Sequence, residues 1–281
     1  MNTPIAMIQF FAKYIEQALG IVYQEANFYQ LETRLMEVAK QTDHETISSL
    51  YESCQHGVSP QIRNLLLDLA TNNETSFFRD AHIFDVLHEL CMNRLRENPN
   101  WQCRIWSTAC SFGQEIYSIA MTLKKVQQVF PNFKFTILAT DIADRALKRA
   151  EEGIYNDLEV GRGLGADLKN RYFEQVQTKP INQWQVKTEL KQNIKFQKQN
   201  LLDPFGALGQ FDLIFCRNVL IYQSVDNKKA IVSKLLKCMH PDAIFFMGAA
   251  ESLIGISDKL TMVRKDKVTF YVNDQHLKKA C

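Results

Sequence analysis

The segment from Ser107 to Gly113 is dense in small side chains and directly follows a short apolar run that is typical of a β-strand. In an open α/β sheet, ligands bind outside the carboxyl ends of the strands, where such turns let a ligand approach the backbone. The segment lacks the G-x-G-x-x-G spacing, so it gives little support to a pyrophosphate site. Taken alone, it is equally consistent with a tight strand-to-helix connection that binds nothing.

An acidic residue, Asp141, ends the next apolar run. A carboxylate in that position can accept hydrogen bonds from both hydroxyls of a ribose. Because a predicted helix follows directly, Asp141 is also a candidate helix N-cap. A turn of small residues and an acid, without phosphate-binding glycines, favours a nucleoside ligand that carries no phosphates. S-adenosylmethionine fits that description.

Three polar side chains, Arg217, Asn218 and Tyr222, follow the apolar run at 211–216. The carboxyl ends of parallel strands meet at one edge of a sheet, so these side chains are expected to face the same crevice. Tyr222 alone is also consistent with an ordinary half-buried core tyrosine. The six histidines and seven cysteines show no metal-ligand spacing, and the sequence predicts no metal site.

The elements that must position these residues alternate in type from about residue 101 onward. Apolar runs predict strands at 103–108, 135–140, 194–199, 211–216 and 244–247. Amphipathic patterns predict helices at 114–129, 143–152 and 226–238. This alternation predicts βαβ units and a mostly parallel sheet.

Two other stretches depart from that rhythm. Runs at 260–264 and 268–272, joined by a Lys-Asp turn, predict an antiparallel hairpin at the sheet edge. Between 153 and 193 the alternation is lost and glycines recur, so we expect an inserted subdomain with a short strand at 184–187.

Residues 1–70 show four successive helical patterns and predict a small all-helical domain. Gly20 is a natural end for the first helix. Thr42 and Glu45 have the spacing of a capping box that would open the third helix, and Ser59-Pro60 would open the fourth. Residues 71–98 are then a linker and a connecting helix at 81–97, and 99–281 form the α/β domain.

The composition is that of an ordinary globular protein. The chain has 281 residues, of which 46% are hydrophobic, and a net charge of +2. So weak a positive charge argues against a nucleic-acid partner. No apolar stretch is long enough to span a membrane, and no signal peptide precedes the first helix. The odd number of cysteines indicates free thiols in a reducing cytoplasm. Nothing demands more than a monomer.

Five segments, taken in order, resemble motifs of the CheR-type chemoreceptor methyltransferases. Residues 73–79 resemble the N-x-T-x-F-F-R segment of that family, and 105–120 resemble its W-S-(small)-G-E-E-P-Y-S-I-A stretch. The other matches are 139–142, 200–202 and 216–222. The resemblance implies a helical N-terminal domain followed by a Rossmann-like seven-stranded methyltransferase domain with a small β-subdomain insertion. It also implies transfer of a methyl group from S-adenosylmethionine to glutamate side chains on the cytoplasmic domains of methyl-accepting chemoreceptors, with S-adenosylhomocysteine as product.

The resemblance also implies roles for individual residues. The implied cofactor contacts are Asn73, Thr75 and Arg79 from the linker, Glu115 and Asp141 at the methionine and ribose ends, Asn200 and Leu201 beside the adenine, and Arg217 with Asn218. Arg79 and Tyr222 are the catalytic candidates, and we expect them to orient the reactants rather than to transfer protons. Arg34 resembles a residue of the basic helix that meets the receptor, although an ordinary surface arginine is the alternative.

The sequence departs from the family pattern at three places. Gln114 and Ile116 stand where Glu and Pro are usual, and 248–252 replaces a G-H-S-E segment. Residues 175–182 lack the glycines of members that dock on a receptor's C-terminal pentapeptide, so we do not expect that tether. Two other functions stay open. One is a non-catalytic S-adenosylmethionine sensor or scaffold. The other is an amine methyltransferase acting on RNA or protein. Residues 217–220 argue against it, because they lack the N-P-P-Y-like motif that such enzymes often carry.

Overall fold

A mixed seven-stranded sheet forms the centre of the computed structural model, which describes residues 4–206 and 208–273. The strand order is β6-β2-β1-β7-β8-β10-β9. The strands are β1 (Gln102–Ser107), β2 (Lys134–Asp141), β6 (Ile194–Lys198), β7 (Phe211–Cys216), β8 (Met239–Met247), β9 (Leu260–Lys265) and β10 (Val268–Asn273). Strands β6, β2, β1, β7 and β8 pair in parallel with their neighbours. Strands β9 and β10 form an antiparallel hairpin, and β10 pairs antiparallel with β8. The predicted sheet and its edge hairpin are confirmed.

Apolar side chains cover both faces of the sheet, because successive residues of a strand point to opposite sides. Ile105 and Phe246 face the core that contains α5 (His82–Glu97) and α6 (Gln114–Val129). Their neighbours Trp106 and Phe245 face the core that contains α11 (Val225–Lys237). A further helix, α7 (Asp144–Glu152), packs beside β2 and β6. The sheet is therefore buried on both sides, and its open strand ends are left to build a site.

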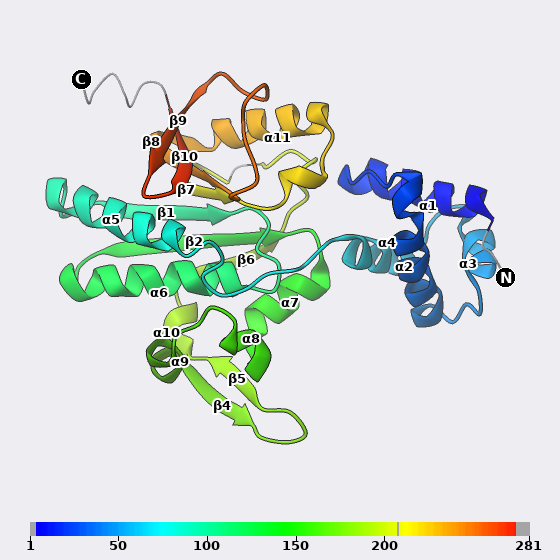
Figure 1. Ribbon diagram of the computed structural model, residues 1–281, viewed down its shortest axis with the longest axis horizontal. Coiled ribbons are helices and arrows are strands. Elements are labelled where there is room, and N and C mark those ends of the chain that lie inside the picture. The colour runs from blue at the N-terminus through cyan, green and yellow to red at the C-terminus, as the bar shows by residue number, and fades with distance from the viewer. Residues whose placement is uncertain (1–3, 207, 274–281) are drawn as a thin grey trace.

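Four helices at the N-terminal end have a hydrophobic core of their own, and Figure 1 shows them beside one end of the sheet. They are α1 (Ile5–Leu19), α2 (Phe28–Gln41), α3 (Ile47–Cys54) and α4 (Pro60–Ala70), with a 3₁₀ turn, η1 (Glu25–Asn27), before α2. Gly20 ends α1 in the left-handed conformation with φ 71°, and the hydroxyl of Ser59 accepts a hydrogen bond from the Ile62 N–H to open α4. Both predicted boundaries are confirmed.

The predicted start of α3 is wrong. The helix begins at Ile47, and its capping box joins Thr46 to Ser49. Thr42 instead lies at the end of α2, where its hydroxyl donates to the Val38 carbonyl at 2.8 Å. Threonine side chains bond to the nearest free backbone group, and the sequence spacing alone cannot say which helix end supplies it.

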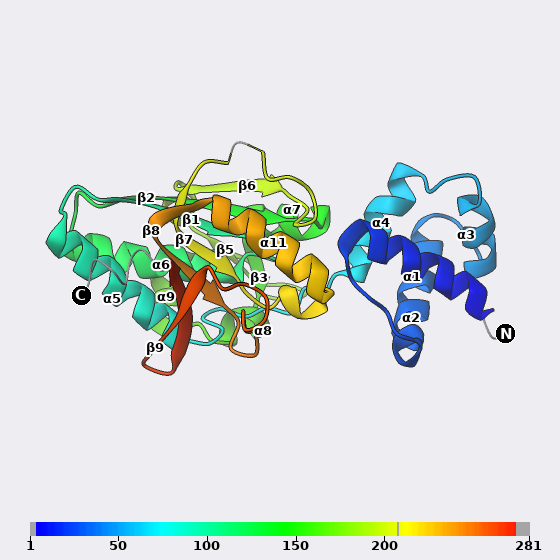
Figure 2. The ribbon, with the colours of Figure 1, turned by 90° about the horizontal axis from the view of Figure 1, so that it is seen from above.

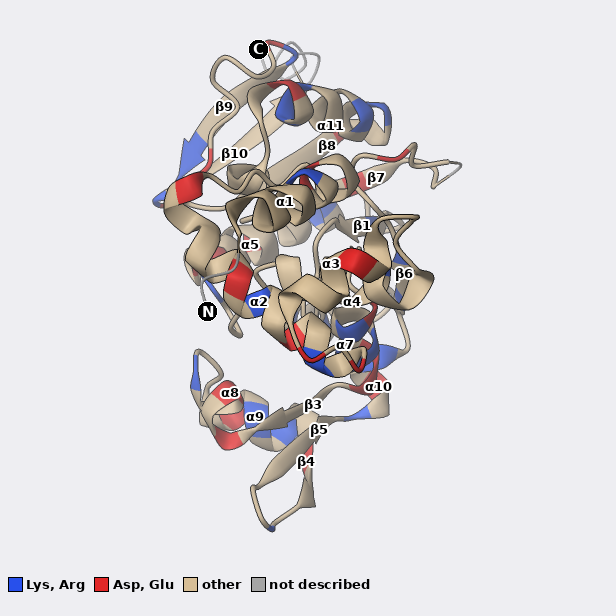
Figure 3. Ribbon diagram, turned by 90° about the vertical axis from the view of Figure 1, so that its right-hand side faces the viewer, with Lys and Arg blue, Asp and Glu red and all other residues tan. Residues whose placement is uncertain are grey.

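The insertion between β2 and β6 folds as expected into a small antiparallel sheet of order β3-β5-β4. Its elements are β3 (Ile154–Asn156), α8 (Asp157–Gly161), α9 (Ala166–Tyr172), β4 (Phe173–Gln177), β5 (Gln183–Val186) and α10 (Thr188–Lys191). Figures 1 and 3 both show this subdomain projecting away from the main sheet. Residues 71–81 connect α4 to α5 and run back from the helices to the carboxyl ends of the strands (Figure 2).

Two further sequence predictions concern disulfide bonds and membrane-spanning helices. The cysteines that the structure describes are all free and buried, and Cys281 lies outside the described residues. Within residues 4–206 and 208–273, none of the helices combines the length and the apolar character that a membrane crossing requires.

Candidate functional site

A cleft of about 940 Å³, open mouth included, lies where the carboxyl ends of β1, β2, β6 and β7 meet the linker and the end of α1. Clefts at the carboxyl ends of the strands are where open α/β sheets bind their ligands. Its lining residues come from the end of α1, the linker and the segments that follow the strands, and they include all of the predicted site residues except Arg34: Asn73, Thr75, Arg79, Glu115, Asp141, Asn200, Leu201, Arg217, Asn218 and Tyr222.

Asp141 ends β2 at the floor of the cleft. Its Oδ2 accepts a hydrogen bond from the Ser111 N–H at 2.8 Å, and its Oδ1 accepts one from the Ala143 N–H at 3.0 Å. Burial raises the pKa of this carboxyl, and the backbone N–H groups oppose the rise. The N-cap alternative is wrong, because α7 begins at Asp144 and has no side-chain cap. Each carboxylate oxygen can accept a further hydrogen bond, so the group suits a pair of ribose hydroxyls.

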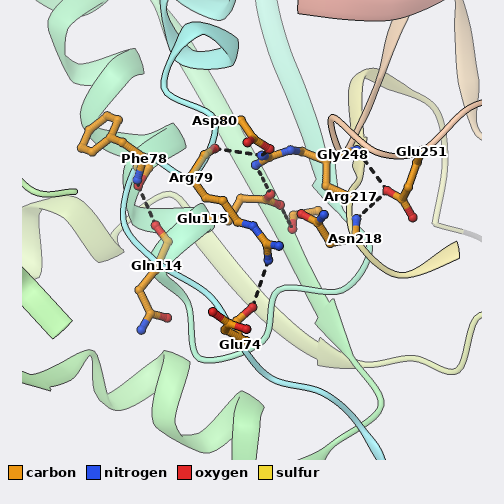
Figure 4. Close-up of polar contacts among 12 residues, drawn as sticks. Glu74, Phe78, Arg79, Asp80, Gln114, Glu115, Arg217, Asn218, Gly248 and Glu251 are labelled. Atoms are coloured by element: carbon orange, nitrogen blue, oxygen red, sulfur yellow. Dashed lines mark hydrogen bonds and ion pairs between the residues drawn. The ribbon is translucent and has the colours of Figure 1, made fainter. Parts of the chain in front are cut away.

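Glu115 and Arg217 form a buried ion pair at the inner wall (Figure 4). Glu115 lies in the first turn of α6, where the helix dipole favours an acid, and its second oxygen accepts from the Ser107 hydroxyl at 2.8 Å. The Arg217 side chain is only 2% exposed and also donates to the Arg79 carbonyl at 2.8 Å and to the Asp80 carboxylate at 2.7 Å. Arg217 therefore bonds the sheet to the linker.

The linker crosses the mouth of the cleft and is held there by several polar contacts. The Asn73 carbonyl accepts from the Ser111 hydroxyl at 3.0 Å. The Asn72 side-chain amide donates to the Tyr222 hydroxyl at 2.9 Å. The Arg79 guanidinium donates to the Glu74 carbonyl at 3.1 Å, and Figure 4 shows its head turned toward Glu74. The segment is thus a wall of the site rather than a free tether.

The helical region contributes apolar lining through Leu19 and Ile21, and Leu201 adds to it from the sheet side. Asn200 bonds across this boundary, since its side-chain amide donates to the Ala18 carbonyl at 2.8 Å. Gln223 makes a similar bond to the Leu19 carbonyl at 2.8 Å. The last carbonyls of α1 are therefore capped by amides from the sheet side of the cleft.

Arg34 is the one predicted residue outside the cleft. Its guanidinium donates to the Tyr23 hydroxyl and, at 2.9 Å, to the Ala70 carbonyl at the end of α4. It is half-buried, so the alternative of an ordinary solvated surface arginine does not describe it. Its role in substrate recognition stays a prediction.

Sequence reasoning missed several residues that shape the cleft. Asn72 lies next to a predicted motif, and that neighbourhood was the only available signal for it. Asp80 and Gln223 reach the site through contacts that span 137 and 204 residues of sequence, and no local pattern indicates them. Glu251 lies in the segment 248–252, which the sequence singled out only as a departure from the family pattern.

The residues of the cleft fit S-adenosylmethionine. Asp141 offers acceptors for a ribose, Glu115 offers a carboxylate for the ammonium of a methionine, and Leu19, Ile21 and Leu201 offer an apolar wall for a base. The turn between β1 and α6 presents no phosphate cradle, and the cofactor carries no phosphate.

Comparison with known proteins identifies the family. Residues 73–269 match the model of the CheR methyltransferase, SAM binding domain. The chain is 36% identical over 256 residues to a chemotaxis protein methyltransferase of Vibrio anguillarum, covering 90% of this chain and 92% of that protein. It is 34% identical over 268 residues to the chemotaxis protein methyltransferase Cher2 of Pseudomonas putida, covering 94% and 96%. Among solved structures it is similar to the N-methyltransferase NodS of Bradyrhizobium japonicum in complex with S-adenosyl-L-homocysteine, at 16% identity and a TM-score of 0.39, over 68% of this chain and 88% of that one.

The family match covers most of the chain, and the curated relatives align over nearly their whole length. The chain belongs to the CheR methyltransferases, and it is a chemotaxis-type, S-adenosylmethionine-dependent methyltransferase.

Proposed function

We propose that this protein transfers a methyl group from S-adenosylmethionine to glutamate side chains of methyl-accepting chemoreceptors, giving glutamate methyl esters. In this proposal it acts as a cytoplasmic monomer on the cytoplasmic domains of the receptors. The observation that carries the proposal is the near full-length similarity to chemotaxis protein methyltransferases, together with the family match over residues 73–269.

The chemistry of the cleft supports a carboxylate acceptor. The bound cofactor supplies an electrophilic methyl group on a positive sulfonium. A glutamate side chain has a reference pKa of about 4.3, so it is already a nucleophile at neutral pH and needs no base. No histidine is among the described residues that line the cleft. In this proposal its two inner carboxylates bind the cofactor, Asp141 at the ribose and Glu115 at the ammonium, so neither is left to act as a base.

Two residues at the mouth are proposed to orient the acceptor. Arg79 places a permanent positive charge there, which attracts a substrate carboxylate. Tyr222 presents a hydroxyl that Asn72 already holds. Charge is neutralised as a carboxylate approaches a sulfonium, so water stabilises the separated reactants more than it stabilises the transition state. A linker that closes over the reactants and excludes water therefore favours the reaction.

The test is a methylation assay with radiolabelled S-adenosylmethionine and receptor cytoplasmic domains that carry Glu or Gln at the methylation sites. Methyl esters release volatile methanol in alkali, whereas N-methyl groups do not. We expect alkali-labile label on the Glu receptors only. Binding of the cofactor without any label would instead indicate a sensor, and alkali-stable label would indicate an amine acceptor.

A further inference from the structure

The connection from β7 to α11 carries five residues that line the cleft, three of them predicted site residues, and has an unusual backbone. Arg217, Asn218 and Tyr222 all lie within six residues of the end of β7. Asn218 adopts the left-handed backbone conformation with φ 57°, which residues other than glycine seldom adopt. Only a 3₁₀ turn, η2 (Leu220–Tyr222), orders the rest of the connection. Something outside this connection must therefore hold it.

Glu251 supplies that support. Its Oε2 accepts hydrogen bonds from the Asn218 N–H at 2.6 Å and from the Gly248 N–H at 3.0 Å (Figure 4). Its Oε1 accepts one from the Ile221 N–H at 3.1 Å. Hydrogen bonds to an ionised acceptor are stronger than those between neutral groups. One carboxylate thus fixes the backbone directly after Arg217 and directly before Tyr222.

The turn that presents Glu251 is built for this contact. The Glu251 N–H donates to the Gly248 carbonyl at 2.9 Å and closes the turn. A Cβ added to Gly248 would lie 2.6 Å from the Asn218 Nδ2 and 2.9 Å from the Glu251 Oε2. Gly248 therefore lets Asn218 and Glu251 approach each other, and the segment 248–252, which sequence reasoning left without a role, gains one.

We propose that Glu251 is a positioning residue for methyl transfer: through the backbone N–H groups of Asn218 and Ile221 it sets Arg217 and Tyr222 in the arrangement that binds the cofactor and orients the acceptor. Glu251 does not line the cleft, so it acts only through these neighbours. The turnover part of this proposal rests on the proposed function, whereas the cofactor-binding part does not.

The main test compares Glu251→Gln with Asp258→Asn. Both changes remove one negative charge from the connection between β8 and β9, but Asp258 is exposed. Glutamine keeps the size of Glu251 and turns an NH₂ group toward a backbone donor. Affinity for S-adenosylhomocysteine, measured by calorimetry on the full chain, is expected to fall about tenfold in Glu251→Gln and to stay unchanged in Asp258→Asn. A lower Tm with unchanged affinity of the folded protein would overturn the proposal.

Turnover separates positioning from a merely structural role. The loss of kcat in Glu251→Gln and in Tyr222→Phe should be non-additive in the double variant, because one residue acts through the other. Additive losses would contradict the proposal. If Glu251→Gln does not fold, Gly248→Ala displaces Asn218 without changing charge and should lower affinity in the same way; unchanged affinity there would equally overturn the proposal. If wild-type protein binds S-adenosylhomocysteine but methylates no receptor, the proposed function fails while the affinity test of Glu251 still stands.

Discussion

The side-chain amide of Asn72 donates a hydrogen bond to the hydroxyl of Tyr222 at 2.9 Å, across 150 residues of sequence. One partner belongs to the linker and the other to the connection after β7, so the two sides of the cleft mouth are bonded to each other. The position of the tyrosine hydroxyl thus depends on the linker as well as on the sheet.

Replacing Tyr222 by Phe removes that hydroxyl and keeps the ring. We expect kcat to fall by about tenfold at saturating cofactor, because the acceptor loses one orienting hydrogen bond. Affinity for S-adenosylhomocysteine, measured by calorimetry, should change little. Asn72→Ala, which leaves the hydroxyl present but unsupported, should lower kcat by less. Unchanged turnover in Tyr222→Phe would remove Tyr222 from the proposed mechanism.

The insertion contacts the linker at Gly163, so a substitution there should displace the linker and change cofactor binding. Gly163 has φ 90°, and a Cβ on it would lie 2.0 Å from the Phe77 carbonyl oxygen. Gly163→Ala is therefore expected to displace the linker and weaken binding of S-adenosylhomocysteine by about tenfold, with about 1–3 kcal/mol of lost stability. Gly161→Ala is the matched control, because nothing lies within 4 Å of its added Cβ. Equal behaviour of the two variants would contradict contact between insertion and linker.

Cofactor affinity should weaken in acid because of Asp141. Burial raises the pKa of this carboxyl above its ordinary value. Ribose hydroxyls donate to the ionised form, so protonation of the free protein competes with binding, and affinity falls as the pH drops through that raised pKa. Calorimetric titrations from neutral pH downward would show the fall. Asp141→Asn should bind more weakly at neutral pH and lose this pH dependence; a retained dependence would point to another group.

Arg217 and Lys265 offer a contrast between buried and exposed ion pairs. Lysine cannot reproduce the planar fork with which Arg217 reaches Glu115, Asp80 and the Arg79 carbonyl, so Arg217→Lys should cost about 2–4 kcal/mol of unfolding free energy. Lys265 pairs with Glu89 at the surface, and Lys265→Ala should cost at most about 1 kcal/mol. Urea denaturation measures both. Similar costs would mean that Arg217 is not the structural link described above.

The sequence predicted the sheet and the insertion from local patterns, whereas most residues of the cleft, among them Asn73 and Asn200, were implied by the family resemblance. Alternating apolar runs placed Asp141 and Arg217 at strand ends, and strand ends meet at one edge whatever the details of packing. The start of α3 was predicted wrongly because a threonine can bond to either neighbouring helix. The bonds of Asn200 and Gln223 to the end of α1 span 182 and 204 residues, and only the folded chain brings those groups together.

Those two bonds have a consequence for how such proteins can be recombined. The amides of Asn200 and Gln223 take the place of water at the last carbonyls of α1, and Leu19 forms part of the cleft wall. A chimera that joins helices α1 to α4 of one relative to the sheet of another would need amides in the places of Asn200 and Gln223. Without them, the last carbonyls of α1 would be uncapped and the wall of the cleft would be displaced. Substitutions on the outer surface of α1 to α4 leave these two bonds intact, whereas exchange of the whole helical unit puts them at risk.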